Sequence, residues 1–393
     1  MNVAPLLDLL LVVILLGYTI YGLTIGLTRS IFVIVGVGLG IFCAALLTPS
    51  ISQLAPIPQV RLIIVVAVAI TLIAVGHAIG SAAGKTVNIS IESKALRGAD
   101  RAVGGLAIAV LAALVISTVS FSAAQLGVPI VSRTIAASSV IRTIQDATPD
   151  VVEATIARWR TALSDRALPL LGSPLGNPNA QVPTIDADSP ALAAAAQSVV
   201  RVTGNAFSCA QGQTGSGFVV AAERVMTNAH VISGTTGPVV EALNGQVLNS
   251  TIVFFDPVND LAVLAVPGLT ADALAVGITS RPGTSTAIQG YPYGGPFTTN
   301  AALVQNVSTF TSPDIYGADG APREVYTLAG QVNPGNSGGP LLTLDGHIVG
   351  TIFGSSTEQN NVGYALTLET VRPVIDDATD FNTPVSSGKC IVH

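Results

Sequence analysis

The sequence predicts two unlike parts, an N-terminal all-α transmembrane domain of four helices and a C-terminal all-β domain. Four apolar stretches precede residue 125, a proline-rich stretch covers 168–190, and short β-favouring runs broken by Gly, Pro and Asn follow it. The last segment has about 200 residues, enough for one two-layered β unit. We therefore predict domains at 1–125 and 191–393, joined by a helix and linker at 126–190.

The four apolar stretches are each long enough to span a bilayer, which takes about 20 apolar residues. They cover Pro5–Leu27, Ser30–Leu47, Val60–Ala83 and Val103–Ala124. A cleaved signal peptide explains one such stretch but not four, and a buried helical soluble domain is the remaining alternative. The pattern predicts a multi-pass membrane protein whose first partner is the lipid bilayer.

Positive residues predict the orientation of these spans. Arg29 lies between the first two, and Lys85, Lys94, Arg97 and Arg101 lie between the last two. Because basic loops stay in the cytoplasm, four spans put both termini on the other side of the membrane. We therefore expect the C-terminal domain on the periplasmic or extracytoplasmic side of the cell (inner) membrane.

Few ionisable residues interrupt the spans. Asp8 lies near a membrane end, where we expect it to be solvated, and His77 lies among small residues that are typical of helix contacts. A proton-sensing role for His77 is the functional alternative. The glycines Gly36, Gly38 and Gly40 predict close helix packing in the second span.

The connection contains an amphipathic stretch at Thr148–Leu163 with Trp159, and it predicts a helix that lies either on the membrane or on the C-terminal domain. Residues 168–190 have the composition of a linker. An autocleavage site in this linker is a further hypothesis.

Three short stretches carry the chemistry. Ser337 lies in Gln331–Pro340, a loop dense in glycine, which lets the backbone aim N–H groups at one point beside the serine hydroxyl. Alone, this stretch is equally typical of a turn. However, His230 ends the β-favouring run at 225–232, and Asp260 precedes the apolar run at 261–264. The order His, Asp, Ser is that of one class of serine protease.

The motifs TNAHV, DPVNDLAVL and NPGNSGGPL resemble trypsin-like serine proteases of the HtrA-related type. The resemblance implies a chymotrypsin-like double β-barrel and an acyl-enzyme mechanism without cofactor or metal. In it, His230 is the general base, Asp260 orients that base and Ser337 is the nucleophile. The N–H groups of Gly335 and Ser337 would form the oxyanion hole. Asp256 is the competing acid, but its position before a proline favours a turn role.

The N-terminal part resembles the membrane domains of the colicin-V-production type. The whole arrangement, without a PDZ domain, resembles actinobacterial acid-resistance membrane proteases. That resemblance implies a role in acid or oxidative stress and in processing of envelope proteins, with protein or peptide substrates.

An α/β-hydrolase is the competing interpretation, because Gly335, Ser337 and Gly339 also fit the nucleophile-elbow pattern. That fold needs its histidine after the serine, and neither His347 nor His393 leaves room for the required elements. Asn336 stands where digestive trypsins carry an aspartate that pairs with a new N-terminus. Activation by such an ion pair is therefore not expected.

Charge and cysteines narrow the partners further. From residue 190 onward there are six Lys and Arg against fourteen Asp and Glu, a net charge of −8, which argues against nucleic acid. Cys209 and Cys390 are the only cysteines of the C-terminal domain, and we predict a disulfide between them, with unpaired buried thiols as the alternative. Cys43 lies in a span as a small apolar residue.

Substrate preference is not readable from the sequence. We expect Gln331, Gly354 and Ser355 to border the substrate pocket, and none of them carries a charge that would select lysine or arginine. The oligomeric state stays open, a monomer included. A membrane-tethered stress sensor or scaffold, with a protease fold that does not turn over substrate, is the rival function. A transporter role is weakened by the scarcity of charge in the spans.

Overall fold

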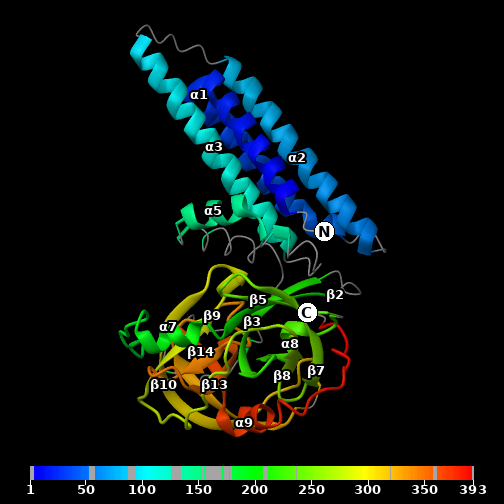
Figure 1. Cartoon of the computed structure of the whole chain (residues 1–393), viewed down its shortest axis with the longest axis vertical. Coiled ribbons are helices and arrows are strands. Elements are labelled where there is room, and N and C mark those ends of the chain that lie inside the picture. The colour runs from blue at the N-terminus through cyan, green and yellow to red at the C-terminus, as the bar shows by residue number, and fades with distance from the viewer. Residues whose placement is uncertain are drawn as a thin grey trace. The chain divides into compact units, whose positions relative to one another are not determined.

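The computed structural model describes residues 4–52, 58–86, 94–124, 134–135, 137–149, 151–152, 155, 170–171, 177, 179–206, 211–235, 237–318, 320–356 and 361–391. The chain forms two compact units (Figure 1), one of Met1–Ala123 with Ala137–Thr148 and one of Ala124–Ala136 with Pro149–His393. The predicted helix at Thr148–Leu163 lies largely outside the described residues. The domain boundaries at 125 and 190 stay predictions.

The first unit consists of four described helices, α1 (Ala4–Ser52), α2 (Pro58–Thr86), α3 (Lys94–Ala124) and α5 (Ser139–Ala147). Within the described residues three helical segments are long and apolar enough to cross a membrane, Ala4–Ala44, Ala67–Thr86 and Leu96–Ser120. The first two predicted spans both lie in α1, which is interrupted at Gly26, where φ is 76°. The count of four membrane crossings therefore stays a prediction.

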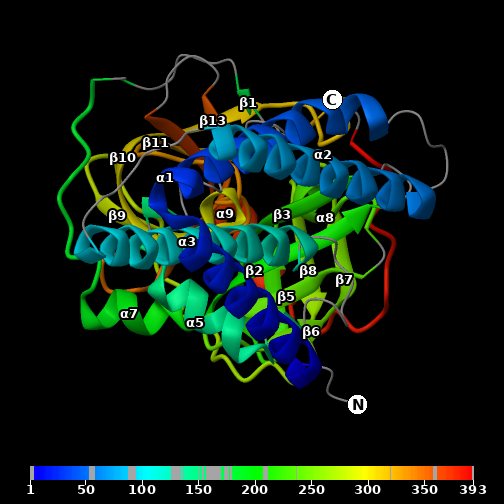
Figure 2. The ribbon, with the colours of Figure 1, turned by 90° about the horizontal axis from the view of Figure 1, so that it is seen from above.

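The contacts of α1 show that its direction reverses at Gly26 (Figure 2). Before the break, Tyr21 hydrogen-bonds Ser81 of α2 at 3.2 Å, and the Tyr18 and Tyr21 rings lie 6.4 and 5.7 Å from the His77 ring. After the break, the backbone of Gly36 contacts that of Gly76, so closely that a Cβ on either glycine would clash. The first half of α1 thus runs parallel to α2 and the second half antiparallel, and His77 is a helix-contact residue.

Asp8 has a structural role in addition to its expected solvation. It accepts hydrogen bonds from the Ser138 hydroxyl, from the Ser139 hydroxyl at 2.6 Å and from the Ser139 N–H at 3.1 Å. An acidic side chain stabilises a helix N-terminus because the first N–H groups there lack partners. Asp8 therefore ties the start of α1 to the start of α5, while its side chain stays partly exposed to solvent, as expected.

The second unit contains two seven-stranded sheets. The first follows the order β6-β5-β2-β3-β4-β8-β7 and the second the order β1-β13-β12-β9-β10-β11-β14, with an additional β13–β14 pairing that closes six strands into a barrel. All strand pairs are antiparallel except β1 with β13. This is the predicted chymotrypsin-like double β-barrel.

The strands of the first sheet are β2 (Val199–Ala206), β3 (Gln211–Ala221), β4 (Arg224–Thr227), β5 (Val239–Ala242), β6 (Val247–Asn249), β7 (Thr251–Asp256) and β8 (Leu261–Ala265). Those of the second are β1 (Leu170–Leu171), β9 (Ser285–Gly290), β10 (Thr298–Thr311), β11 (Pro322–Ala329), β12 (Pro340–Leu342), β13 (Ile348–Ser356) and β14 (Val362–Thr367). Helices α7 (Pro190–Ala196), α8 (Ala229–Ile232) and α9 (Leu368–Asp376) and the 3₁₀ turn η2 (Pro292–Gly294) complete the unit.

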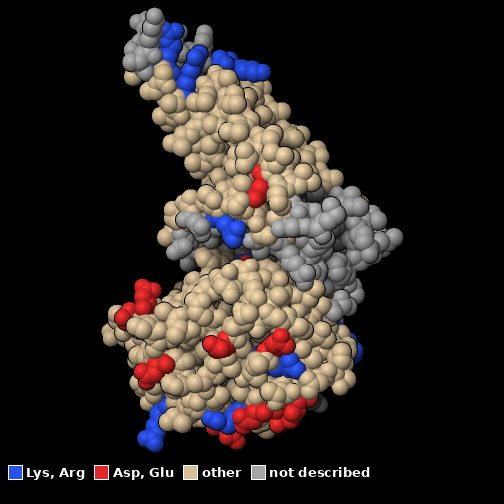
Figure 3. Space-filling view, viewed as in Figure 1, with Lys and Arg blue, Asp and Glu red and all other residues tan. Residues whose placement is uncertain are grey.

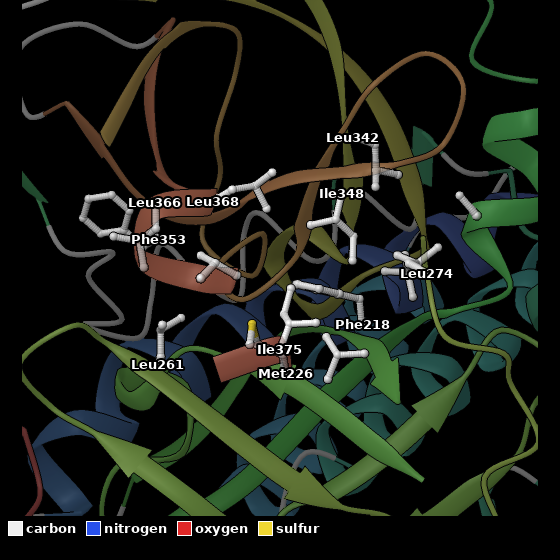
Figure 4. Close-up of a cluster of buried hydrophobic side chains, with 14 of the residues drawn as sticks. Phe218, Met226, Leu261, Leu274, Leu342, Ile348, Phe353, Leu366, Leu368 and Ile375 are labelled. Atoms are coloured by element: carbon white, nitrogen blue, oxygen red, sulfur yellow. The ribbon is translucent and has the colours of Figure 1, made fainter. Parts of the chain in front are cut away.

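The largest buried apolar cluster joins the two barrels (Figure 4). Phe218, Met226 and Leu261 come from the first sheet, whereas Leu342 and Phe353 come from the second. Buried apolar surface contributes about 25 cal/mol per Å², so this shared core holds the barrels as one body. The loops that carry the candidate site lie where the two sheets meet.

The two units differ in surface charge and in the state of their cysteines. In Figure 3 the visible face of the helical unit is almost uncharged along its length, while acidic side chains are scattered over the β unit. Cys43 is a free thiol on α1, and Cys390 is disulfide-bonded. Cys209 lies outside the described residues, so its pairing with Cys390 stays a prediction.

Candidate active site

The three predicted catalytic residues come from both barrels. His230 lies in α8 directly after β4, and Asp260 ends the turn between β7 and β8. Ser337 lies in the loop between β11 and β12 of the second sheet. Residues separated by about a hundred positions are therefore brought to the junction of the barrels.

His230 and Asp260 form a doubly hydrogen-bonded pair. The His230 N–H donates to Asp260 Oδ1 at 2.9 Å, and His230 Nδ1 lies 2.7 Å from Asp260 Oδ2. An ionised carboxylate only accepts hydrogen bonds, so Nδ1 donates to Asp260, and in the neutral imidazole Nε2 then keeps its lone pair. The second bond also fixes the ring plane, which leaves Nε2 as the proton acceptor of this pair.

The Asp260 backbone is held in a strained conformation. Its φ is 57°, one of three positive values at non-glycine residues in the described part of the chain. Such a conformation costs on the order of 1–3 kcal/mol and persists only when neighbours hold it. The Asn228 side-chain amide donates to the Asp260 carbonyl at 2.8 Å, and the Asp260 side chain is 3% exposed. Asp260 is therefore held firmly and shielded from water, while the His230 side chain stays partly exposed.

Asp256, the competing acid, has a different task. Its carboxylate accepts hydrogen bonds from the N–H groups of Val258 and Asn259, at 2.9 and 3.0 Å, and from the Asn259 side chain at 2.7 Å. These bonds cap the turn that leads to Asp260. The interpretation of Asp256 as a turn residue is confirmed.

Ser216 of β3 fixes the Ser337 loop against the first barrel. The Ser216 N–H donates to the Ser337 carbonyl at 2.8 Å, and its hydroxyl donates to the Gly335 carbonyl at 2.6 Å. Gly338, with φ of 80°, lies so near that a Cβ on it would be 3.0 Å from the N–H nitrogen of Asn228. Ser337 is therefore held next to the segment that carries His230.

The Ser337 hydroxyl is itself unpaired. Its Oγ is buried and makes no hydrogen bond to any described residue, the His230 ring included. Catalytic hydrogen bonds are often long in a substrate-free site and tighten when substrate binds. The base and the hydroxyl thus come from adjoining segments, and no hydrogen bond joins them.

Two backbone N–H groups beside Ser337 are free to bind an oxyanion. Within the described chain, the N–H of Asn336 donates to the Asn333 carbonyl at 3.0 Å, but those of Gly335 and Ser337 have no acceptor. Gly335 adopts φ of 96°, and a Cβ there would meet Tyr293 N at 2.7 Å and Gly294 N at 2.9 Å. Only glycine fits this position.

The expected pocket residues lie near the loop without forming a charged site. Gln331 is exposed at its start, and Gly354 and Ser355 lie on β13, where Ser355 pairs with Leu170 of β1. The described part of the chain contains no group of three or more His, Cys, Asp or Glu residues suited to hold a metal ion.

The sequence did not single out Ser216, Tyr293 or Arg323, which all contact the site or lie close to it. Arg323 is 5% exposed and lies 5.6 Å from the Phe353 ring. Burial lowers the pKa of its guanidinium, whereas the charges of Asp260, Asp256 and Asp314 act in the opposite direction. Two sequence features could have pointed to the other residues. Tyr293 lies in the glycine- and proline-rich run Gly290–Pro296, and Ser216 lies between two glycines at 215–217.

Together these features define a serine protease of the chymotrypsin-like class, joined to an apolar helical unit. Comparison with known proteins agrees. A model of the trypsin-like peptidase domain matches residues 215–350, and a model of the colicin V production protein matches residues 7–149.

The serine protease Rv3671c of Mycobacterium tuberculosis is 29% identical over 395 residues, covering 98% of each chain. The crystal structure of Rv3671c protease, active form, is 33% identical with a TM-score of 0.51 and covers 56% of this chain and all of the other. The putative serine protease HhoB of Synechocystis is 30% identical over 167 residues, covering 42% of this chain and 40% of its own. The chain belongs to the trypsin-like serine proteases, with a colicin-V-production helical unit preceding the protease, and it is a serine endopeptidase.

Proposed function

We propose that His230, Asp260 and Ser337 form the catalytic triad and that the N–H groups of Gly335 and Ser337 form the oxyanion hole. The observation that carries the proposal is the doubly bonded His230–Asp260 pair beside a serine whose two neighbouring N–H groups are unpaired. Each group then has the protonation state and position that acyl transfer needs.

In this mechanism the Ser337 oxygen attacks the substrate carbonyl carbon while its proton passes to His230 Nε2. The C–O bond forms, the carbonyl π electrons move to the oxygen, and the resulting oxyanion accepts the two N–H bonds. The intermediate collapses, the C–N bond breaks, and His230 gives its proton to the departing amine. Water then attacks the acyl-enzyme with His230 again as base, which releases the acid and restores Ser337.

The test is labelling of the full-length protein in detergent with a fluorophosphonate probe, beside Ser337→Ala and His230→Ala. We expect labelling of the wild type alone, because only an activated serine reacts. The unpaired Ser337 hydroxyl gives the rival scaffold function its specific support. Unlabelled wild-type protein at every pH, with full binding of a protein partner, would decide for that function.

We also propose that the protease lies on the extracytoplasmic side of the inner membrane. Arg29 contacts the backbone of Gly84, next to Lys85 at the end of α2, and Gly26 contacts Asp100, next to Arg101. These basic residues thus share the end of the helical unit at which α1 breaks. Asp8 contacts α5 at a distance of about one membrane-spanning helix from that break. The positive-inside rule assigns the basic end to the cytoplasm. Cysteine accessibility to a membrane-impermeant maleimide, at Lys85→Cys and Ser139→Cys, tests this: only the second is expected to react in intact spheroplasts.

Processing of envelope proteins under acid or oxidative stress is the physiological role we propose, on the resemblance of the whole chain and on its acidic protease region. A deletion strain carrying either wild type or Ser337→Ala tests it. Growth at low pH should be restored by the wild type alone.

A further inference from the structure

Tyr293 lies in the 3₁₀ turn η2 and touches the Ser337 loop at two points. Its hydroxyl donates to Asn333 Oδ1 at 2.7 Å, and its backbone N–H donates to the Pro334 carbonyl. Both contacts precede Gly335, whose N–H is one of the two proposed oxyanion donors. Tyr293 is thus bonded to the two residues that determine how this N–H is presented.

The bond from the Tyr293 N–H to the Pro334 carbonyl also determines the direction of the Gly335 N–H. The described chain has no cis peptide bond, so the Pro334 carbonyl and the Gly335 N–H lie in one peptide plane and point in opposite directions. A carbonyl held by Tyr293 therefore turns the Gly335 N–H away from η2, toward the free side of the loop. Rotation of this plane would remove the donor and replace it with a carbonyl oxygen, which repels an oxyanion.

The backbone of Tyr293 is strained for this purpose. Its φ is 59° and ψ is 15°, a left-handed conformation that a tyrosine rarely adopts. Of the three non-glycine residues with positive φ in the described part, Asp260 and Tyr293 both belong to the surroundings of the site. Strain of this kind clusters where a fold presents a functional group, and here it aims the Tyr293 N–H at Pro334.

The turn that carries Tyr293 is anchored in the first barrel. The Tyr291 N–H donates to the Ser216 hydroxyl at 2.9 Å, and the Arg201 guanidinium donates to the Gly294 carbonyl at 3.0 Å. Arg201 also pairs with Glu241 at 2.5 Å. Arg201 thus ties η2 to the first barrel, and Ser216 bonds both η2 and the Ser337 loop, which makes η2 a support for that loop.

We propose that Tyr293 is a positioning residue that orients the Pro334–Gly335 peptide so that the Gly335 N–H faces the oxyanion. The proposal rests on the proposed triad and oxyanion hole. Tyr293 acts on the loop through its bonds to Asn333 and Pro334. Its loss should reduce stabilisation of the transition state more than binding of the substrate.

The test uses full-length protein in detergent, with fluorescently labelled casein as substrate and the fluorophosphonate as probe. In Tyr293→Phe only the hydroxyl bond is lost, and kcat should fall about 3- to 10-fold with KM within twofold. In Tyr293→Gly the N–H remains and the strain is relieved, but the ring and hydroxyl no longer hold the loop. There kcat should fall about 10- to 100-fold at an unchanged or higher Tm.

Tyr326→Phe is the control, because it also removes a tyrosine hydroxyl in the same barrel, together with its bonds to the Ser280 N–H at 2.8 Å and to the Thr279 side chain. We expect a lower Tm and wild-type kcat. Wild-type kcat and labelling rate in Tyr293→Phe and Tyr293→Gly would overturn the positioning role while leaving the triad intact. Wild-type protein that the probe does not label would overturn both proposals.

Discussion

Substitution of Gly335 by alanine tests whether its N–H is an oxyanion donor, because the effect on kcat can be compared with the effect of backbone strain on Tm. Gly335 has φ of 96°, and a Cβ would meet the backbone of the η2 turn, with Tyr293 N at 2.7 Å and Gly294 N at 2.9 Å. Backbone atoms cannot move aside as a flexible side chain can. We therefore expect the 333–337 loop to shift and the Gly335 N–H to leave the proposed oxyanion hole.

Gly283→Ala is the control, because Gly283 has a similar φ of 88° in the same barrel but nothing within 4 Å of an added Cβ. Both variants carry the conformational cost of about 1–3 kcal/mol. In a domain of about 200 residues this lowers Tm by roughly 2–10 °C. Only Gly335→Ala also loses an oxyanion donor, which costs roughly 100- to 1000-fold in kcat.

The assay is thermal unfolding and casein turnover of both variants in detergent. We expect similar losses of Tm from strain, with a further loss in Gly335→Ala from the clash, and a fall of kcat in Gly335→Ala alone. If Gly335→Ala kept kcat within threefold of the wild type, its N–H would not be an oxyanion donor. An equal fall of kcat in Gly283→Ala would mean that strain, and not the site, had been measured.

Four further outcomes are expected. Asp260→Asn should fold normally but lower kcat by about 10⁴-fold, because His230 would be held in the wrong tautomer; kcat measured at constant Tm checks this. Ser216→Ala leaves buried partners unpaired at both bonds of its hydroxyl, so urea unfolding should show a loss of about 1–3 kcal/mol, and an unchanged midpoint would contradict it. Burial raises the pKa of Tyr326 above the ordinary tyrosine value of about 10, so stability should be full below about pH 10 and fall above it, where the unfolded chain releases a proton that the folded chain keeps. Tyr326→Phe should flatten that fall in unfolding free energy, and an identical slope would refute the linkage. Gly36→Ala should lower the Tm of the helical unit in detergent through its contact with α2, whereas Gly38→Ala, with open space around it, should not.

Several features of the site followed from the sequence because local chemistry dictates them. Glycine at 335 and 338 is demanded by positive φ, and the turn before Asp260 needs the carboxylate of Asp256 as its cap. The strands around His230 also follow from local pattern, since a β-favouring run precedes it. Such determinants act over a few residues and are therefore readable without a fold.

The helical unit shows where local pattern stops being sufficient. Hydropathy identified the apolar stretches and the junction between the first two, but not that the chain reverses at Gly26 itself, or that Asp8 meets Ser138 and Ser139. Hydropathy averages over a window and carries no information on which carboxylate reaches which helix end. Those contacts depend on how the helices pack.

By itself, the sequence determined the class of this protein, because three short motifs carry the chemistry and four apolar stretches carry the membrane signal. Only the tertiary structure decided how the oxyanion loop is held. Ser216 and Tyr293 reach Gly335 and Pro334 from segments 119 and 41 residues away along the chain, as the folded barrels bring them together. Hydrogen bonds between distant segments depend on the three-dimensional path of the backbone, and no local periodicity records that path.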